Sequence, residues 1–423
     1  MTSSTQASPL GVGAKSGADP EALLALGTAP KAEADGGALL LEWTEARRAA
    51  GPVWRDEKGH YHVFRHADVT QVVADPVTFS SDTITRPSGG LASPPPGTLL
   101  LMDPPRHRRM RRLVTQAFSA RRVDALGTRI TEIAEQLLDR LAGPTQQPGE
   151  VHEFDLVHAF ADPLPVTVIA ELLGVPLADL PRFQNWADRF LVARPDEPEG
   201  AADLRAGVVE MQAYLQGRVT LSRAEPGADL IGSLVKAEVD DKSLDDIEII
   251  SFAALLLLAG HVTTAVLLGN VLLCLDAAPE EMAALRADPA RIPLVIEETL
   301  RLRPPFLAVD RLTTRDVELA GTPIPENSFV HLWLLSANRD ERVFEAPHAF
   351  RPGRPESSQV AFGHGIHFCL GAPLARMEGR IALRLLLERF ADIQVRHDVE
   401  LSWHMNNVLG ARHLPVRVVP RGR

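Results

Sequence analysis

The sequence predicts a mainly helical protein with a small β region. Three observations support this fold class. Residues 251–276 form the longest apolar run, which has the length of a central buried helix. Residues 122–240 alternate amphipathic helical patterns with proline and glycine breaks. Short β-like runs, by contrast, gather near the start of the chain, at residues 53–54 and 61–64.

The composition describes a globular chain and limits its partners. The 423 residues are 45% hydrophobic and 23% charged, enough to bury a large core. Two cysteines provide no disulfide framework, which fits a reducing cytosol. A formal net charge of −11 gives no reason to expect nucleic acid or an anionic membrane as a partner. We therefore expect a cytoplasmic protein.

The domain organisation is read from local composition. Residues 1–35 are rich in Ser, Gly and Ala and predict a flexible N-terminal tail, which leaves residues 36–423 for the folded part. No basic stretch leads into an apolar one near the N-terminus, so neither a secretory signal nor a membrane anchor is expected. Length alone suggests two or three domains at roughly 150 residues each. No Gly/Ser linker or internal repeat divides the chain after residue 40.

The first predicted elements are short. A helix over residues 41–50 ends at Gly51 and Pro52, the β-like runs follow, and a second helix covers residues 67–74. Residues 81–100 contain three consecutive prolines and therefore predict a loop instead of a helix.

One of the two cysteines lies in a loop with several glycines, residues 362–371. A helix is predicted directly after it, over residues 373–390, so Cys369 comes just before a helix N-terminus, where the helix dipole favours thiolate. Gly365 and Gly371 allow backbone angles closed to other residues and the close approach of a flat ligand. No second Cys or His follows at zinc-finger spacing, so a thiolate ligand for iron fits better than structural zinc.

This loop resembles the haem-ligand signature of the cytochrome P450 family. The matching positions are Phe362, Gly365, His367, Cys369 and Gly371. The resemblance implies the cytochrome P450 fold, a single large domain that holds haem b (iron protoporphyrin IX) between a central long helix and the Cys-ligand loop. It also implies that Cys369 is the axial iron ligand, and it places Phe362, His367 and Gly371 at the haem.

The apolar run contains a second family motif. Residues 259–264 resemble the oxygen-activating pattern small-Gly-x-acid-Thr-Thr, which places Ala259 and Gly260 against the haem. A glycine inside a helix costs roughly 1 kcal/mol relative to alanine and so needs a reason, such as room for dioxygen. Thr263 is predicted to bond to the carbonyl of Ala259, four residues back, and to steer protonation during oxygen activation.

The chain departs from this motif at one position. Val262 stands where the family has Asp or Glu, and a valine cannot relay protons. His261 titrates near neutral pH, but it lies about 100° around the helix from Val262. We therefore expect water, a substrate hydroxyl or another side chain to deliver protons.

Basic residues are predicted to bind the haem propionates. His107 and Arg111 are four residues apart on one helical face, and guanidinium groups bind carboxylates with two parallel hydrogen bonds. The assignment follows from the family resemblance, whose His-x-x-x-Arg pattern falls on His107 and Arg111 and which gives Arg311 and His367 the same task. The neighbouring arginines are predicted on the surface or in a basic patch for an acidic electron donor: Arg108, Arg109 and Arg112.

Two further sets of residues follow from the resemblance. Glu298 and Arg301, three positions apart on a helix, form the family's structural ion pair, which Arg354 completes. Residues 81–100 would roof the substrate pocket. The side chains expected to line that pocket are Leu255, Leu258, Phe306, Leu307, Val309 and Val408.

The resemblance implies a monooxygenase. It would use O2 and two electrons from NAD(P)H, delivered by ferredoxin reductase and ferredoxin, to hydroxylate or epoxidise a hydrophobic small molecule in secondary metabolism. Three alternatives stay open. In the first, the same haem site uses peroxide, or catalyses a coupling or rearrangement, because the acid is missing. In the second, the chain is a haem sensor without turnover. In the third, residues 251–276 cross a membrane.

Overall fold

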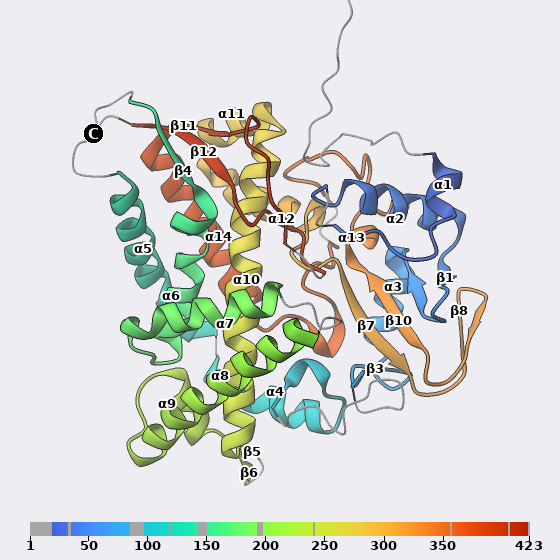
Figure 1. Ribbon diagram of the computed structural model, residues 1–423, viewed down its shortest axis with the longest axis horizontal. Coiled ribbons are helices and arrows are strands. Elements are labelled where there is room, and N and C mark those ends of the chain that lie inside the picture. Colours follow the sequence, from blue (N-terminus) through green and yellow to red (C-terminus); the bar gives the residue numbers. More distant parts are fainter. Residues whose placement is uncertain are drawn as a thin grey trace, which may run out of the picture.

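One long helix, α10, lies between a helical side and a sheet side of the molecule (Figure 1). It spans Asp246–Asp276. This computed structural model describes residues 19–32, 35–84, 97–118, 120–142, 150–192, 198–239, 242–355, 358–404 and 407–421.

The helices carry most of the structure, as predicted. They are α1 Pro20–Leu24, α2 Ala38–Ala50, α3 His66–Ala74, α4 Arg106–Ala117, α5 Ala120–Ala142, α6 Pro163–Leu172, α7 Leu180–Val192, α8 Pro198–Ala224, α9 Leu230–Lys236, α10, α11 Pro279–Ala287, α12 Ile292–Leu302, α13 Leu334–Ala337 and α14 Ala372–Arg389. Short helical turns add η1 Leu99–Leu101, η2 Val157–Ala161, η3 Leu177–Asp179, η4 Pro289–Arg291 and η5 Gly365–His367.

The strands form small sheets. The largest has the order β1-β2-β10-β7-β3, in which β2 and β10 are parallel and the other neighbours antiparallel. A second sheet has the order β11-β12-β4, and two hairpins pair β5 with β6 and β8 with β9. The strands are β1 Val53–Arg55, β2 Tyr61–Val63, β3 Phe79–Ser80, β4 His152–Asp155, β5 Glu238–Val239, β6 Lys242–Ser243, β7 Ala308–Thr313, β8 Val317–Leu319, β9 Thr322–Ile324, β10 Phe329–Trp333, β11 Phe390–Val395 and β12 Pro415–Pro420.

Helix α10 starts at a capping box and is buried along most of its length. The Asp245 side chain accepts from the Glu248 backbone N–H at 2.7 Å, and the Glu248 side chain accepts from the Asp245 N–H at 3.2 Å. Of the described helices, α10 is the one long and apolar enough to span a bilayer, yet 72% of its most apolar window is buried. It packs against α6, α8, α12 and α14. Its apolar side chains are therefore part of the core.

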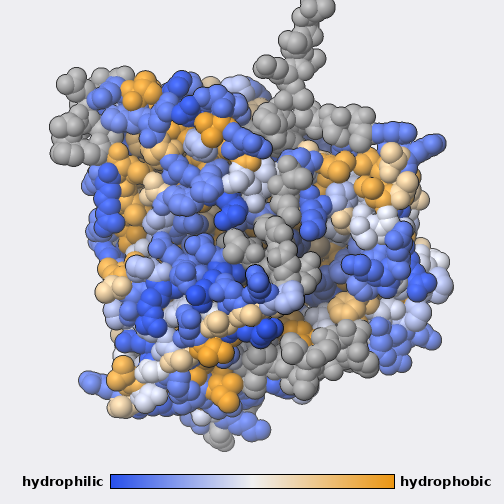
Figure 2. Space-filling view, viewed as in Figure 1, coloured by the Kyte–Doolittle hydropathy of each residue, from blue (hydrophilic) through white to orange (hydrophobic). Residues whose placement is uncertain are grey.

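The surface of the molecule differs from this core. Hydrophilic residues cover most of the face shown in Figure 2, and hydrophobic residues occur there as scattered spots. The largest core cluster joins residues of α4, α5, α6, α10 and α14. A separate cluster lies under the main sheet, around Val63, Val73 and Val330.

The expected N-terminal tail is too long. Residues 1–18 lie outside the described part, but α1 is folded and packs on α2. Leu23 is buried with Leu40 and Trp43, and the Arg47 guanidinium donates to the carbonyl oxygens of Leu24 and Leu26. Because these contacts satisfy both apolar and polar groups, the packed structure begins before residue 36.

The expected roof loop is described only in part. Residues 85–96, including the three prolines, lie outside the described residues. Residues 97–105 lead through η1 into α4, and Gly97 has a φ of +93°. A Cβ on Gly97 would lie 2.3 Å from the carbonyl oxygen of Glu248, so the chain passes α10 here at a distance that only glycine permits.

Candidate functional site

The cysteine loop runs directly into α14. The Cys369 N–H donates to the Phe362 carbonyl at 2.9 Å, and Gly371 is the N-cap residue of the helix. Gly365 has a φ of +69°, and a Cβ there would lie 2.8 Å from the Val73 carbonyl oxygen of α3. Only glycine satisfies both conditions, as the sequence predicts.

Gly371 differs from that expectation. Its φ is −80°, an angle open to any residue. A Cβ at this position would instead lie 3.9 Å from the Cys369 sulfur. Glycine therefore leaves space beside the thiol and is not required by the backbone angle.

The electrostatics of the thiol differ from the prediction as well. Burial by the surrounding loop raises the pKa of Cys369, although its side chain stays exposed on an open side. The N–H groups of Gly371 and Ala372 and the charge of Arg111 lower the pKa, but desolvation is the larger effect. The helix N-terminus alone therefore does not produce a thiolate here. A metal cation at the sulfur would supply the missing stabilisation.

Part of α10 is less deeply buried than the rest of the helix. Between Glu248 and Leu275, five side chains of this buried helix are exposed or partly exposed: Ala254, Leu255, Leu258, Ala259 and Thr263. With about 3.6 residues per turn they share one side of the helix. Because α10 packs against α14, this open face and the Cys369 loop belong to neighbouring elements. The arrangement provides an accessible surface on an otherwise buried helix, which packs against the helix that follows the exposed Cys369.

The residues of the Ala259–Thr264 motif point in different directions. Thr263 Oγ1 donates to the Ala259 carbonyl at 2.7 Å, as predicted. Val262 is 5% exposed, so the position that holds an acid in the family is part of the core. His261 is also buried, and its Nε2 lies 3.6 Å from Asp162 Oδ1, away from Thr263. Neither Val262 nor His261 therefore replaces the missing acid beside Thr263.

Gly260 has a packing role. A Cβ on it would lie 2.8 Å from Cδ1 of Ile169 on α6. The glycine therefore lets α6 and α10 approach each other. This close packing is a sufficient reason for a glycine inside the helix, and room for dioxygen is not needed to explain it. Contact of Ala259 and Gly260 with haem stays a prediction.

The four residues predicted at the propionates converge from three segments. The rings of His107 and His367 lie 4.3 Å apart between centroids. Arg111 donates to the Phe368 carbonyl at 2.8 Å, and both Arg111 and Arg311 act electrostatically on His367. The structure thus brings together residues that the sequence separates by up to 260 positions.

Both imidazoles are neutral at physiological pH. Burial, with the charge of Arg111, lowers the pKa of His107 to about 4. Burial, with the nearby His107, Arg311 and Arg111, lowers the pKa of His367 to about 3. His107 Nε2 is buried and has no hydrogen-bond partner among the described residues. An orphaned buried ring nitrogen of this kind fits a ligand that brings its own polar group.

Arg311 supports the same fit. Its side chain is 6% exposed, and its Nη1 donates to the Asp310 carbonyl at 2.8 Å. Within the described part of the chain no carboxylate forms an ion pair with it. A buried guanidinium without an anion is costly, and a propionate would neutralise it. The donor set therefore fits haem: one thiol, two cations and two neutral imidazoles.

The predicted structural ion pair is present and buried. The Arg301 guanidinium donates to both carboxylate oxygens of Glu298, each at 2.8 Å. Arg354 Nε donates to Glu298 Oε1 at 2.8 Å and completes the network. Arg301 also donates to the carbonyls of Asn338 and Pro347, each at 2.8 Å. The group fixes the segment before the cysteine loop.

Two residues predicted to line the substrate pocket lie together. Phe306 and Val408 pair in an isolated antiparallel bridge, so the C-terminal turn reaches the segment after α12 as expected. Phe306 is 38% exposed and Val309 partly exposed, whereas Leu307 and Val408 are buried. Leu307 packs in the cluster around Trp43, so its side chain belongs to the core of the sheet side.

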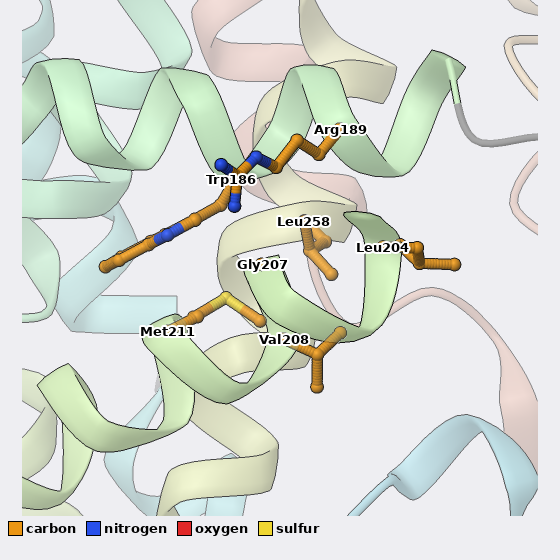
Figure 3. A pocket seen from close by; sticks show the side chains of 7 residues that line it. All are labelled: Trp186, Arg189, Leu204, Gly207, Val208, Met211 and Leu258. Carbon is orange, nitrogen blue, oxygen red and sulfur yellow. The ribbon is translucent and has the colours of Figure 1, made fainter. Parts of the chain in front are cut away.

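Leu258 lines a small cavity between three helices. Its side chain meets residues of α7 and α8, and the cavity has a volume of about 10 Å³ (Figure 3). The other lining residues are Trp186, Arg189, Leu204, Gly207, Val208 and Met211. Leu258 therefore joins the open face of α10 to the α7–α8 pair that covers it. Leu255 is partly exposed on the same face.

Two further polar side chains, Ser81 and Asn270, carried little signal in the sequence. Ser81 Oγ lies 2.9 Å from His367 Nε2, and Asp103 accepts from the Ser81 N–H at 3.0 Å. Asn270 of α10 is fully buried and donates to the carbonyls of Arg303 and Leu409 at 3.1 and 2.7 Å. A polar residue in the apolar run was the one available hint, because buried amides need partners.

The surface arginines of α4 divide into two groups. Arg109 forms an ion pair with Glu248 at 2.8 Å and so anchors α4 to the start of α10. Arg108 and Arg112 are exposed. Phe362, predicted at the haem, lies under the Arg376 guanidinium, 4.6 Å from the ring centroid.

Comparison with known proteins agrees with this geometry. The cytochrome P450 family model matches residues 18–189 and 208–409. Erythromycin C-12 hydroxylase of Saccharopolyspora erythraea is 47% identical over 383 residues, which cover 89% of this chain and 94% of that protein. Cyclomarin C epoxidase CymV of Salinispora arenicola is 42% identical over 376 residues, which cover 88% and 93%.

A solved structure extends the match to three dimensions. The open form of cytochrome P450 EryK from S. erythraea is 45% identical, with a TM-score of 0.86, and the match covers 94% of this chain and 99% of that one. The mainly helical fold with small sheets is therefore confirmed. Membership of the family implies haem as the cofactor, a redox partner and a small-molecule substrate. The chain belongs to the cytochrome P450 family and is a haem-dependent monooxygenase.

Proposed function

We propose that this monooxygenase hydroxylates or epoxidises a largely apolar secondary metabolite. One O2, two electrons, two protons and one substrate molecule would yield the oxygenated product and one water. The observation that carries the proposal is the exposure of Ala259 and the partial exposure of Thr263 on α10, a helix that packs against α14, which begins directly after the loop of the exposed Cys369.

Each predicted residue has one task in this proposal. Bound haem supplies oxygen activation and O–O cleavage, which the thiolate ligand favours. Cys369 holds the cofactor from one side. His107, His367, Arg111 and Arg311 hold its carboxylates.

Thr263 would orient a water molecule in the site. Its hydroxyl hydrogen is engaged by the Ala259 carbonyl at 2.7 Å, so its oxygen is left as a hydrogen-bond acceptor. A water that donates to Thr263 is held in place and can pass a proton onward. Because Val262 is buried and cannot titrate, such a water chain, or a hydroxyl of the substrate, replaces the acid of the family.

The substrate class rests on the pocket and on the relatives. The partly exposed residues of the predicted pocket are apolar: Leu255, Leu258, Phe306 and Val309. Relatives are described as an erythromycin hydroxylase and a cyclomarin epoxidase. The electron donors would be ferredoxin and ferredoxin reductase with NAD(P)H, in the cytoplasm.

The test is reconstitution with a ferredoxin, a ferredoxin reductase and NADPH. Erythromycin-type and cyclomarin-type precursors are the first compounds, and a product heavier by one oxygen is expected. Thr263→Ala should lower product formed per NADPH at least severalfold, whereas Thr264→Ala, at a buried neighbouring position, should not. Equal coupling in the two variants would contradict the role of Thr263. The absence of oxygenated product from every compound tested would contradict the substrate class.

A second candidate uses hydrogen peroxide in place of O2 and electrons, or catalyses coupling or rearrangement. The buried Val262 favours it, because no titrating side chain occupies the position before Thr263. Peroxide without redox partners would then give product at a rate equal to or above the reconstituted rate. A much slower peroxide reaction would leave the first candidate.

A further inference from the structure

Three metal-binding side chains meet on the surface, outside the haem site. Asp155 ends β4, His158 lies in η2, and His413 comes just before β12. One ligand atom from each lies within 4.8 Å of the other two. The strands involved, β4 and β12, are neighbours in one sheet (Figure 1).

The distances fit a common ligand. His413 Nδ1 lies 2.9 Å and His158 Nδ1 3.7 Å from Asp155 Oδ2. Zinc bonds of about 2.0–2.1 Å at tetrahedral angles place ligand atoms roughly 3.3 Å apart. The two observed distances lie on either side of this value. The imidazole rings are stacked, with centroids 4.6 Å apart and 12° between planes, so the two rings approach one carboxylate together.

Hydrogen bonding explains only part of the arrangement. The bond from His413 to Asp155 is well formed at 2.9 Å, but 3.7 Å is too long for a hydrogen bond from His158. Asp155 Oδ1 accepts from the backbone N–H groups of Val157 and Leu414 at 2.9 and 3.2 Å. One carboxylate oxygen is thus used to hold the backbone, and the other is presented to both imidazoles.

The surroundings favour a cation. Asp162 directly follows η2, and Asp188 of α7 interacts electrostatically with both Asp162 and His158. Arg412, which interacts with Asp188, offsets the negative charge of one carboxylate. With Asp155 the local charge is negative, and two imidazoles with one carboxylate form a donor set typical of zinc and neighbouring transition metals.

We propose that Asp155, His158 and His413 bind one divalent transition-metal ion of the zinc class. Three protein ligands leave a position for water. The ion would join η2 to the segment that runs from the pocket residue Val408 to β12, and so would tie that segment to the β4–β12 sheet. The site does not depend on the haem chemistry.

The experiment uses the haem-loaded full chain, treated with EDTA and desalted. Zinc chloride is added in a calorimetric titration near pH 7.5, where free histidines are largely neutral. One equivalent should bind, and zinc should raise the thermal unfolding midpoint. His158→Ala and His413→Ala should each weaken the affinity at least tenfold and remove the shift of the midpoint. Both side chains are about half exposed, so both variants are expected to fold and retain haem.

The matched control is His397→Ala. His397 lies 2.8 Å from Asp276 and is 46% exposed, like His413, but has no third ligand in the described chain. The His397→Ala variant should bind zinc with the affinity of the wild type. Three outcomes would overturn the proposal: no zinc binding, wild-type affinity in either histidine variant of the site, or an equal loss in His397→Ala.

Discussion

Ser81 Oγ lies 2.9 Å from His367 Nε2, although 286 positions separate the two residues. This contact joins the segment after β3 to the cysteine loop. The ring of His367 in turn lies 4.3 Å from that of His107 on α4. Three distant segments therefore hold the side of the site where the carboxylates of haem are predicted.

Ser81→Ala should loosen haem binding. The substitution removes a hydrogen bond to a buried imidazole, worth about 1 kcal/mol, which corresponds to about fivefold faster loss of haem. Transfer of haem to a scavenger protein measures this rate. Thr83→Ala, two residues away, is the control and should leave the rate unchanged. Identical rates for wild type and Ser81→Ala would show that the contact does not help to hold haem.

Glu298→Ala should strongly destabilise the protein. Arg301 and Arg354 would lose the carboxylate that both contact, and breaking a buried pair costs about 3–5 kcal/mol. Urea unfolding followed at the Soret band measures the loss. The control is Glu388→Ala, which breaks an exposed pair with Arg384 and should cost about 0–1 kcal/mol. Similar costs for the two substitutions would contradict the structural role of the buried network.

Val262→Glu tests the missing acid. We expect more product per NADPH, because a carboxylate beside Thr263 can relay protons, and lower stability, because the site is 5% exposed. Val262→Gln has the same shape and cannot titrate, so it should share the loss of stability without the gain. If Glu leaves both rate and coupling unchanged, Val262 does not limit proton delivery.

The buried Glu378 should make stability depend on pH. Burial raises the pKa of this α14 side chain to about 8, above the usual value of 4.5 for a glutamate. Between these values the folded chain binds the proton and the unfolded chain does not, so stability falls as pH rises from about 4.5 to 8. The slope is up to about 1.4 kcal/mol per pH unit.

The variant Glu378→Gln cannot titrate and should lack this slope. Unfolding free energies of wild type and variant, measured from pH 5 to 8, should converge or cross as the wild type loses stability. Glu388→Gln on the exposed face of α14 is the control. Parallel curves for wild type and Glu378→Gln would mean that Glu378 does not titrate in this range.

Local spacing was enough to predict several features. Thr263 and Ala259, or Glu298 and Arg301, are one helical turn apart, and the structure contains both contacts. The cysteine loop is a continuous segment, so its sequence alone indicated the cofactor and the reaction. Cys274 in the apolar run is a core thiol, and burial raises its pKa to about 11.

The tertiary structure decided what residues of distant segments do together. Helix packing against Ile169 gave Gly260 its role, and desolvation reversed the expected pKa shift of Cys369. Sequence patterns report neighbours within a turn or a loop, because backbone geometry relates those positions directly. Burial and contacts such as Ser81 with His367 depend instead on how distant segments pack, and no local pattern encodes them.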